Sequence, residues 1–124
     1  MQATSALNWF EIPAKDLRRA TRFYETVLGR KLKPDTIGAQ QLSIFAYEQP
    51  GVGGCLIAGS GYVPGATGTV VYLGVDPGLD DALKRVEHAG GKIALPKTEL
   101  PEGMGVYAHV IDSEGNRVGL HASA

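Results

Sequence analysis

Cysteine and long apolar runs are both scarce in this sequence, and each absence narrows what the protein can be. Cys55 is the single cysteine, so no disulfide can form within the chain, which suits a reducing compartment. No apolar stretch approaches the roughly 20 residues needed to span a bilayer. The first residues also lack the charged start and apolar run of a signal peptide. These absences predict a cytoplasmic protein with no membrane partner.

An excess of charge of one sign is also missing. The chain carries 12 basic and 13 acidic residues, a formal net charge of −1, with no basic block or stripe. Nucleic-acid binding depends on such a basic surface, so no nucleic-acid partner is expected. The glycines at 51–54 are not followed by the Gly-Lys-Ser/Thr of a phosphate-binding loop. Residues 112–116, Asp-Ser-Glu-Gly-Asn, have too few ligands for a metal loop and predict a turn.

Glycine is abundant, with 17 residues, and the 7 prolines are likewise spread through the chain. This distribution favours many short strands joined by turns over a helix bundle. A length of 124 residues favours one compact domain, 1–124, that buries roughly two-thirds of its unfolded surface.

The first half of the chain predicts one strand, one helix and further strands. Residues 8–13 alternate in polarity, which is typical of a strand. Asp16 is a good helix N-cap and Gly29 a good C-terminal stop, with apolar residues at helical spacing between them. The remaining elements of this half are strands around 30–34, at 42–47 and at 55–58, before a connecting loop at 59–68.

The second half repeats this pattern. Its predicted elements are a strand at 69–75, a helix at 79–89, a strand at 92–95, a loop at 96–104, and strands at 105–111 and 117–122. Leu17 and Leu79 are 62 positions apart, as are Gly29 and Gly91. Such a repeat predicts two modules of one architecture, at about 5–60 and 68–123, in an α+β fold.

Four segments carry a family resemblance. They read FEIPAKDLRRATRFYETVLG near the start, then GTVVYLGV, VEHAGGKIALPKT and IDSEGNRVGLHAS. Their order and spacing resemble the vicinal oxygen chelate superfamily, which includes glyoxalases, bleomycin-resistance proteins and dioxygenases. The resemblance implies two βαβββ modules whose sheets curl into an open, cup-shaped barrel with helices outside. It also implies a small-molecule ligand in the cup and pairing of chains as homodimers.

The resemblance further implies four cup-facing strand positions at which metal-dependent members carry His or Glu. In this chain they fall at Trp9, Cys55, Val70 or a neighbour, and Gly119. Indole, isopropyl and hydrogen offer a metal no lone pair, and one thiol cannot hold Mg, Mn or Fe firmly. We therefore expect a subgroup without the usual metal ligands, and neither a metal nor another cofactor.

Other residues of the predicted cup face have a functional and a structural interpretation. Trp9 and Tyr72 would wall a ligand or pack in the core, and Glu11 would hold a ligand or lie at the surface. His121 shares the face of Gly119, whereas the face of His109 is left open. The predicted ligand-binding set is Trp9, Glu11, Cys55, Val70, Tyr72, Gly119 and His121.

Three functions compete at this point. The leading hypothesis is a metal-independent protein that sequesters or acts on a flat apolar or cationic molecule. The alternative is a metal-dependent, glyoxalase-like lyase or isomerase, or a dioxygenase, that uses displaced ligands. Those ligands would be Glu11, Cys55, His109 and His121. A third possibility is an interaction module whose cup is filled by its own side chains.

Overall fold

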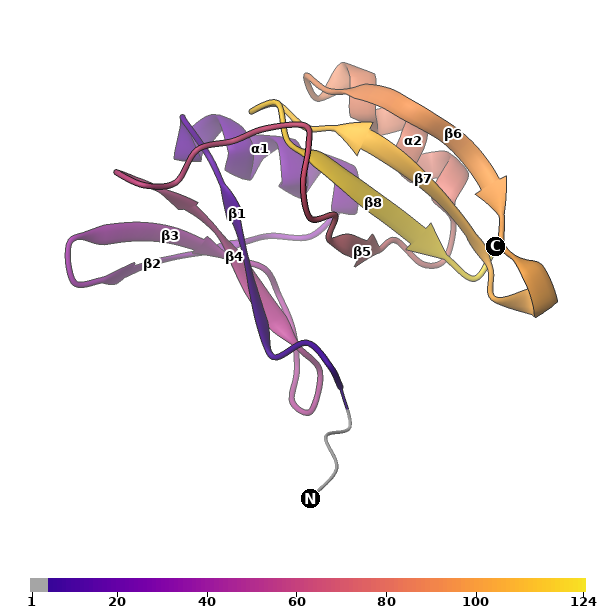
Figure 1. The fold of residues 1–124 in the computed structure, drawn as a ribbon, viewed down its shortest axis with the longest axis horizontal. Helices are drawn as coiled ribbons and strands as arrows, with labels where there is room; N and C mark the ends of the chain where they lie inside the picture. The colour runs from indigo at the N-terminus through magenta and orange to yellow at the C-terminus, as the bar shows by residue number, and fades with distance from the viewer. Residues whose placement is uncertain (1–4) are drawn as a thin grey trace.

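A computed structural model describes residues 5–124, which form two successive βαβββ modules (Figure 1). The first module contains β1 (Trp9–Pro13), α1 (Leu17–Leu28), β2 (Lys33–Ile37), β3 (Gln40–Ile44) and β4 (Gly53–Ala58). The second contains β5 (Tyr72–Gly74), α2 (Leu79–His88), β6 (Lys92–Glu99), a short 3₁₀ turn (Pro101–Gly103), β7 (Val106–Ile111) and β8 (Arg117–Ala122). The α+β class and the two repeated modules are as the sequence predicts.

Each module builds one four-stranded mixed sheet. Sheet A, of the first module, has the order β1-β4-β3-β2, and sheet B has the corresponding order β5-β8-β7-β6. In both sheets the first strand of the module pairs in parallel with the last, and the other pairs are antiparallel. The internal repeat in the sequence is therefore a repeat of topology.

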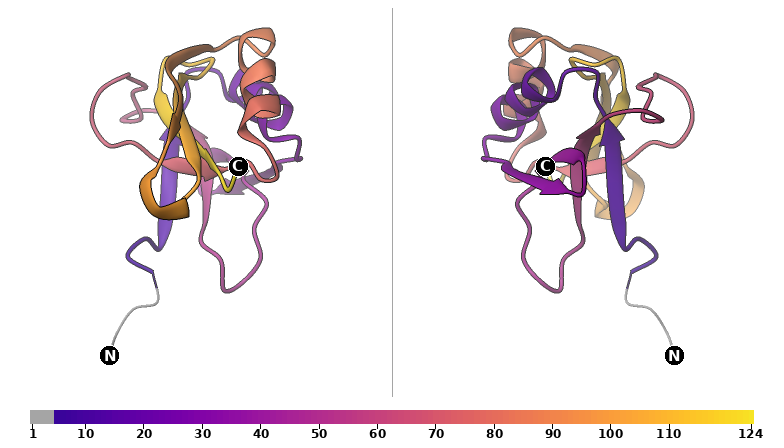
Figure 2. Two further views of the ribbon diagram at one scale, coloured as in Figure 1. Left: turned by 90° about the vertical axis from the view of Figure 1, so that its right-hand side faces the viewer. Right: turned by 90° about the vertical axis from the view of Figure 1, so that its left-hand side faces the viewer.

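Helix α1 follows its local signals closely. The Asp16 carboxylate accepts a hydrogen bond from the Arg19 backbone N–H, and Gly29 ends the helix with a left-handed φ of 68°. Helices α1 and α2 pack against each other, and Figure 2 shows both on one side of the sheets, with the linker between the modules on the other. The helices and both sheets share one core, which includes Phe23, Leu56 and Leu120.

Strand alternation gives each sheet a face turned toward the helices and a face turned away from them, called here the outer face. Ile12 and Leu56 pack into the shared core from sheet A, as Val110 and Leu120 do from sheet B. By strand register, the outer face of sheet A consists of Trp9, Glu11, Leu42, Ile44, Gly53, Cys55 and Ile57. The outer face of sheet B consists of Tyr72, Gly74, Tyr107, His109, Ile111, Arg117, Gly119 and His121.

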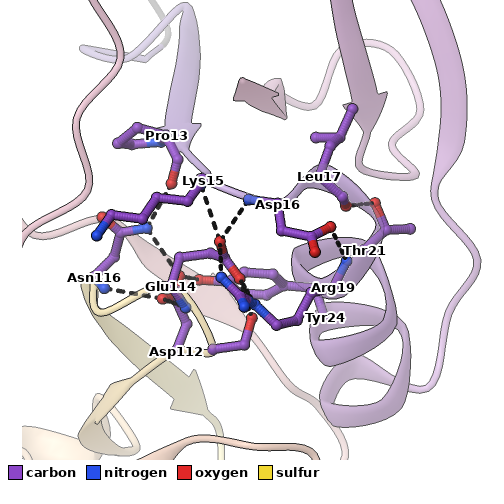
Figure 3. A network of polar contacts seen from close by, with 11 residues as sticks. Pro13, Lys15, Asp16, Leu17, Arg19, Thr21, Tyr24, Asp112, Glu114 and Asn116 are labelled. Atoms are coloured by element: carbon purple, nitrogen blue, oxygen red, sulfur yellow. Dashed lines mark hydrogen bonds and ion pairs between the residues drawn. The ribbon is translucent and has the colours of Figure 1, made fainter. Parts of the chain in front are cut away.

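The turn at 112–116 joins the two modules. Figure 3 shows the Glu114 carboxylate accepting backbone N–H bonds from Lys15 and Asp16 and side-chain bonds from Arg19, all from the first module. Tyr24 donates its hydroxyl proton to Asp112. Burial opposes ionisation of Glu114, but the bonds from Arg19, Asp16 and Ser113 outweigh it and lower the pKa to about 2. A turn that the sequence identified locally thus also clamps the start of α1.

Several predicted boundaries are wrong. The strand at 69–75 shrinks to Tyr72–Gly74, the residues in register with Gly119–His121 of β8. The loop at 96–104 starts too early, since β6 runs to Glu99, and register shifts beside Leu95 accommodate Pro96, which has no N–H to donate. The strand at 42–47 ends at Ile44, and the one around 30–34 starts at Lys33. None of the helices within residues 5–124 is long and apolar enough to cross a membrane.

Candidate functional site

Trp9 forms an aromatic corner at the edge of sheet A. Its indole is 40% exposed and lies edge-on to the ring of Tyr47, with the ring centroids 6.1 Å apart. Tyr47 lies against Gly53, where a Cβ atom would come within 2.5 Å of the ring. Glycine at this position therefore lets the tyrosine ring approach the strand that pairs with β1.

Cys55 and Glu11 are partners across β1 and β4, but their surroundings differ. Glu11 is exposed, whereas Cys55 is fully buried with Leu42 and Ile57 in a small cluster against which Tyr62 of the linker packs. Burial raises the pKa of the Cys55 thiol to about 11, and the charge of Glu11 acts in the same direction, against a hydrogen bond to Trp9. Cys55 is therefore a poor nucleophile at neutral pH.

The outer face of sheet B carries a hydrogen-bonded row of side chains across three strands. The Tyr72 ring lies over Gly119, where a Cβ atom would come within 2.3 Å of the ring. Its hydroxyl is 2.6 Å from Nε2 of His109, and Nδ1 of His109 is 3.2 Å from an Arg117 guanidinium nitrogen. The outer face of sheet B above Gly119 is therefore covered by an aromatic ring.

His121 extends this face toward its far end. Its Nε2 donates to the carbonyl oxygen of Met104, 2.7 Å away, because a carbonyl can only accept. His121, Tyr107 and Tyr72 line a shallow concavity of about 490 Å³ together with Gly74 and Leu100. Pairing of β7 with β8 puts His109 on the same face, which the sequence had left open.

A cleft of about 520 Å³, called here the inter-module cleft, lies between β1, the β3–β4 loop and β5. Its lining is largely apolar and includes four aromatic side chains: Phe10, Phe45, Tyr47 and Tyr72. Val70, half-buried just before β5, lies in the same cleft, as does Arg30, which donates to the Gly74 carbonyl oxygen. Trp9 contacts this cleft's wall through Tyr47.

The predicted residues are thus distributed over several places. Glu11 lines a separate concavity of about 400 Å³ with Arg117. Sequence reasoning missed Tyr47, Tyr107 and Arg117. Period-two alternation could have grouped Tyr107 with His109, and Arg117 with Gly119 and His121. No local signal marks Tyr47, whose position follows from a loop folding back over Gly53.

The metal positions implied by the resemblance do not fit a divalent ion. Trp9, Val70 and Gly119 offer no ligating side-chain atom, and the Cys55 thiol is buried with a raised pKa. In the part of the chain that the structure describes, no three His, Cys, Asp or Glu side chains cluster as a metal site would need. The displaced set keeps Glu11 and Cys55 on sheet A, and His109 and His121 on sheet B.

Several proteins of known structure share this fold. A maize (Zea mays) glyoxalase I mutant superposes with a TM-score of 0.68 at 23% identity, covering 94% of this chain but only 46% of the maize chain. A hypothetical protein from S. aureus gives 0.68 at 19% identity, with 98% and 96% covered. A mutant of the fosfomycin resistance protein FosX from Listeria monocytogenes, complexed with Mn(II), gives 0.68 at 16%, with 99% and 95% covered.

A comparison with curated protein sequences finds no match. The model of one protein family does match, over residues 6–120, which is most of the chain. The chain therefore belongs to the glyoxalase/bleomycin resistance protein/dioxygenase superfamily.

Proposed function

We propose that this protein binds a flat, largely apolar small molecule in the inter-module cleft, without a metal. The observation that carries the proposal is the cleft's lining, in which Phe10, Phe45, Tyr47 and Tyr72 surround about 520 Å³. Pockets of this size with aromatic walls suit a small planar ligand. The protein would either sequester the molecule bound in this cleft or act on it chemically.

The charges near the cleft refine the ligand. Arg30 is the charged residue of its lining, whereas Glu11, which suggested a cationic ligand, lines a different concavity with Arg117. The geometry therefore supports an uncharged ligand, or one with an acceptor group near Arg30, more strongly than a cation.

Tryptophan fluorescence tests this proposal directly. Trp9 is the single tryptophan and contacts Tyr47 of the cleft wall, so an aromatic ligand in the cleft is expected to change its emission. Val70→Phe would fill the cleft and weaken binding by about tenfold, a loss typical of a steric clash in a small pocket. Val63→Phe is the matched control, because Val63 is 80% exposed on the linker. Equal affinity of both variants would refute the site, and loss of binding after chelation would refute metal independence.

We also propose that two copies of the chain associate at the Trp9 end of the outer face of sheet A. Trp9 and Tyr47 are large, are 40–42% exposed and lie on or beside this face, and an interface there leaves Tyr72 of sheet B accessible. Two-fold pairing is the commonest way for a chain to cover such surface with its own copy. Sedimentation equilibrium should show a dimer at micromolar concentration, and a monomer throughout that range would refute it. With a net charge of −1, neither nucleic acid nor an anionic membrane is proposed as a partner.

A further inference from the structure

Hydrogen-bond directions on the outer face of sheet B follow from the chemistry of Arg117. A guanidinium can only donate, so Nδ1 of His109, 3.2 Å away, must accept. The imidazole is then neutral and carries its proton on Nε2. That N–H points at the Tyr72 oxygen, 2.6 Å away, which must accept it.

This order leaves the Tyr72 hydroxyl proton available. Among the hydrogen bonds of residues 5–124, His109 is the one partner of the Tyr72 hydroxyl. The tyrosine side chain is 50% exposed and borders the concavity with Tyr107 and His121. The row Arg117–His109–Tyr72 therefore ends in an O–H donor at the edge of an accessible hollow.

Three features keep the row in this state. Arg117 is held from behind by the Ala66 carbonyl oxygen of the linker, so the guanidinium stays beside His109. Burial and the positive charge of Arg117 both lower the pKa of His109, which keeps the imidazole neutral at neutral pH. Gly119 allows the Tyr72 ring to lie flat across β8 and reach His109.

We propose that the concavity of sheet B binds the acceptor oxygen of a planar molecule, such as a phenolate, with Tyr72 as the hydrogen-bond donor. An accepting oxygen on the ligand would complete the row, and a negatively charged oxygen would gain further from Arg117 behind it. The Tyr107 and His121 rings supply flat surfaces beside this donor. Tyr72 and Gly74 also border the inter-module cleft, but Leu100, Tyr107 and His121 line only this concavity, and the proposal does not depend on binding in the cleft.

The experiment uses 4-nitrophenolate as the probe, with nitrobenzene, which lacks the phenolate oxygen, as the comparison ligand. Binding of 4-nitrophenolate to the full chain is measured by equilibrium dialysis at mildly alkaline pH, where the probe is ionised. Tyr72→Phe keeps the ring over Gly119 and removes the hydroxyl, which is both the proposed donor to the ligand and the acceptor of the His109 N–H. We expect it to weaken probe binding by about tenfold or more, as for loss of a charge-assisted hydrogen bond. Tyr62→Phe is the matched control: it removes a tyrosine hydroxyl from the linker packed against sheet A and should leave the affinity unchanged.

His109 is a positioning residue in this proposal, because it orients the Tyr72 hydroxyl and does not contact the ligand. Two substitutions distinguish this hydrogen-bonding role from a packing role. Glutamine can accept from Arg117 and donate to Tyr72, so His109→Gln should retain most of the affinity, whereas His109→Leu should lose it. NMR of the imidazole nitrogens should find the proton on Nε2 in the free protein. Equal binding by wild type and Tyr72→Phe would overturn the inference, as would a proton on Nδ1. Binding of nitrobenzene without 4-nitrophenolate would overturn it while leaving the cleft proposal standing, and binding of neither would count against both.

Discussion

The two sheets have corresponding strand orders, but the outer face of sheet A is largely buried and apolar, whereas that of sheet B is partly exposed and polar. On sheet A, Leu42, Cys55 and Ile57 are at most 3% exposed and form a small core with Tyr62 of the linker. On sheet B, Tyr107, His109 and His121 are partly exposed; the rings of Tyr107 and His109 lie edge to face, and His121 bonds to the Met104 carbonyl oxygen. The repeated backbone topology therefore does not determine how buried or how polar each outer face is. The linker packs on the outer face of sheet A, whereas polar side chains stay partly exposed on the outer face of sheet B.

A pair of isoleucines provides the largest expected contrast. Ile57→Ala removes a buried side chain from sheet A and should lower the free energy of unfolding by about 3 kcal/mol. Ile111→Ala changes a half-buried side chain on sheet B and should cost about half as much, because less apolar surface is re-exposed. Urea denaturation measures both losses. Equal losses would mean that the two faces are equally packed.

Cysteine labelling tests the same contrast by reactivity. With its pKa raised to about 11, the Cys55 thiol should react with a disulfide reagent roughly 100-fold more slowly than a free thiol, since the thiolate is the reactive form. A Cys55→Ser, Ser60→Cys double variant moves the thiol to an exposed linker position and should label rapidly. Similar labelling rates in the native proteins would show that the cluster on sheet A is open.

The turns that close the two modules differ as well. The β7–β8 turn clamps α1 through Glu114, so Glu114→Gln should cost about 2 kcal/mol, as for loss of hydrogen bonds to a buried charge. The change Glu48→Gln in the β3–β4 loop, where the carboxylate is exposed, is the control and should cost little.

The Glu114 clamp also predicts a pH dependence. The pKa of Glu114 in the folded protein, about 2, lies below its ordinary value of 4.5, so the unfolded chain binds the proton more tightly. The stabilisation is therefore complete above pH 4.5 and is lost as the pH falls toward 2. Acid denaturation of Glu114→Gln should lack this contribution, and an identical acid profile to wild type would contradict the clamp.

A glycine pair on sheet B gives the smallest effect on stability. Gly119→Ala should displace the Tyr72 ring, whose exposed position lets it swing away at a cost of about 1 kcal/mol or less. Gly74→Ala on the same face meets nothing within 4 Å and should be nearly neutral. The decisive measurement is the NMR titration of His109, which should change in Gly119→Ala and not in Gly74→Ala. An unchanged titration in both would show that Tyr72 and His109 are not coupled.

The sequence by itself determined the elements whose causes are local. Asp16 and Gly29 bound α1 as predicted, because a cap bonds backbone groups within a few residues. The turn at 112–116 is set by Asp112, whose carboxylate accepts from the Glu114 and Asn116 N–H groups. The same periodicity repeated 62 positions later predicted the second module and a helix at 79–89, which the structure has at Leu79–His88.

Only the tertiary structure decided how the outer faces are used. Tyr72 and His109 are 37 positions apart, and Glu114 and Arg19 are 95 apart, so no local pattern pairs them. Whether Cys55 is buried depends on where the linker carries Tyr62, and the space above Gly119 depends on which way the Tyr72 ring lies. Strand alternation fixes which side chains share a face, but the neighbours that cover or bond them come from distant segments brought together by the common core.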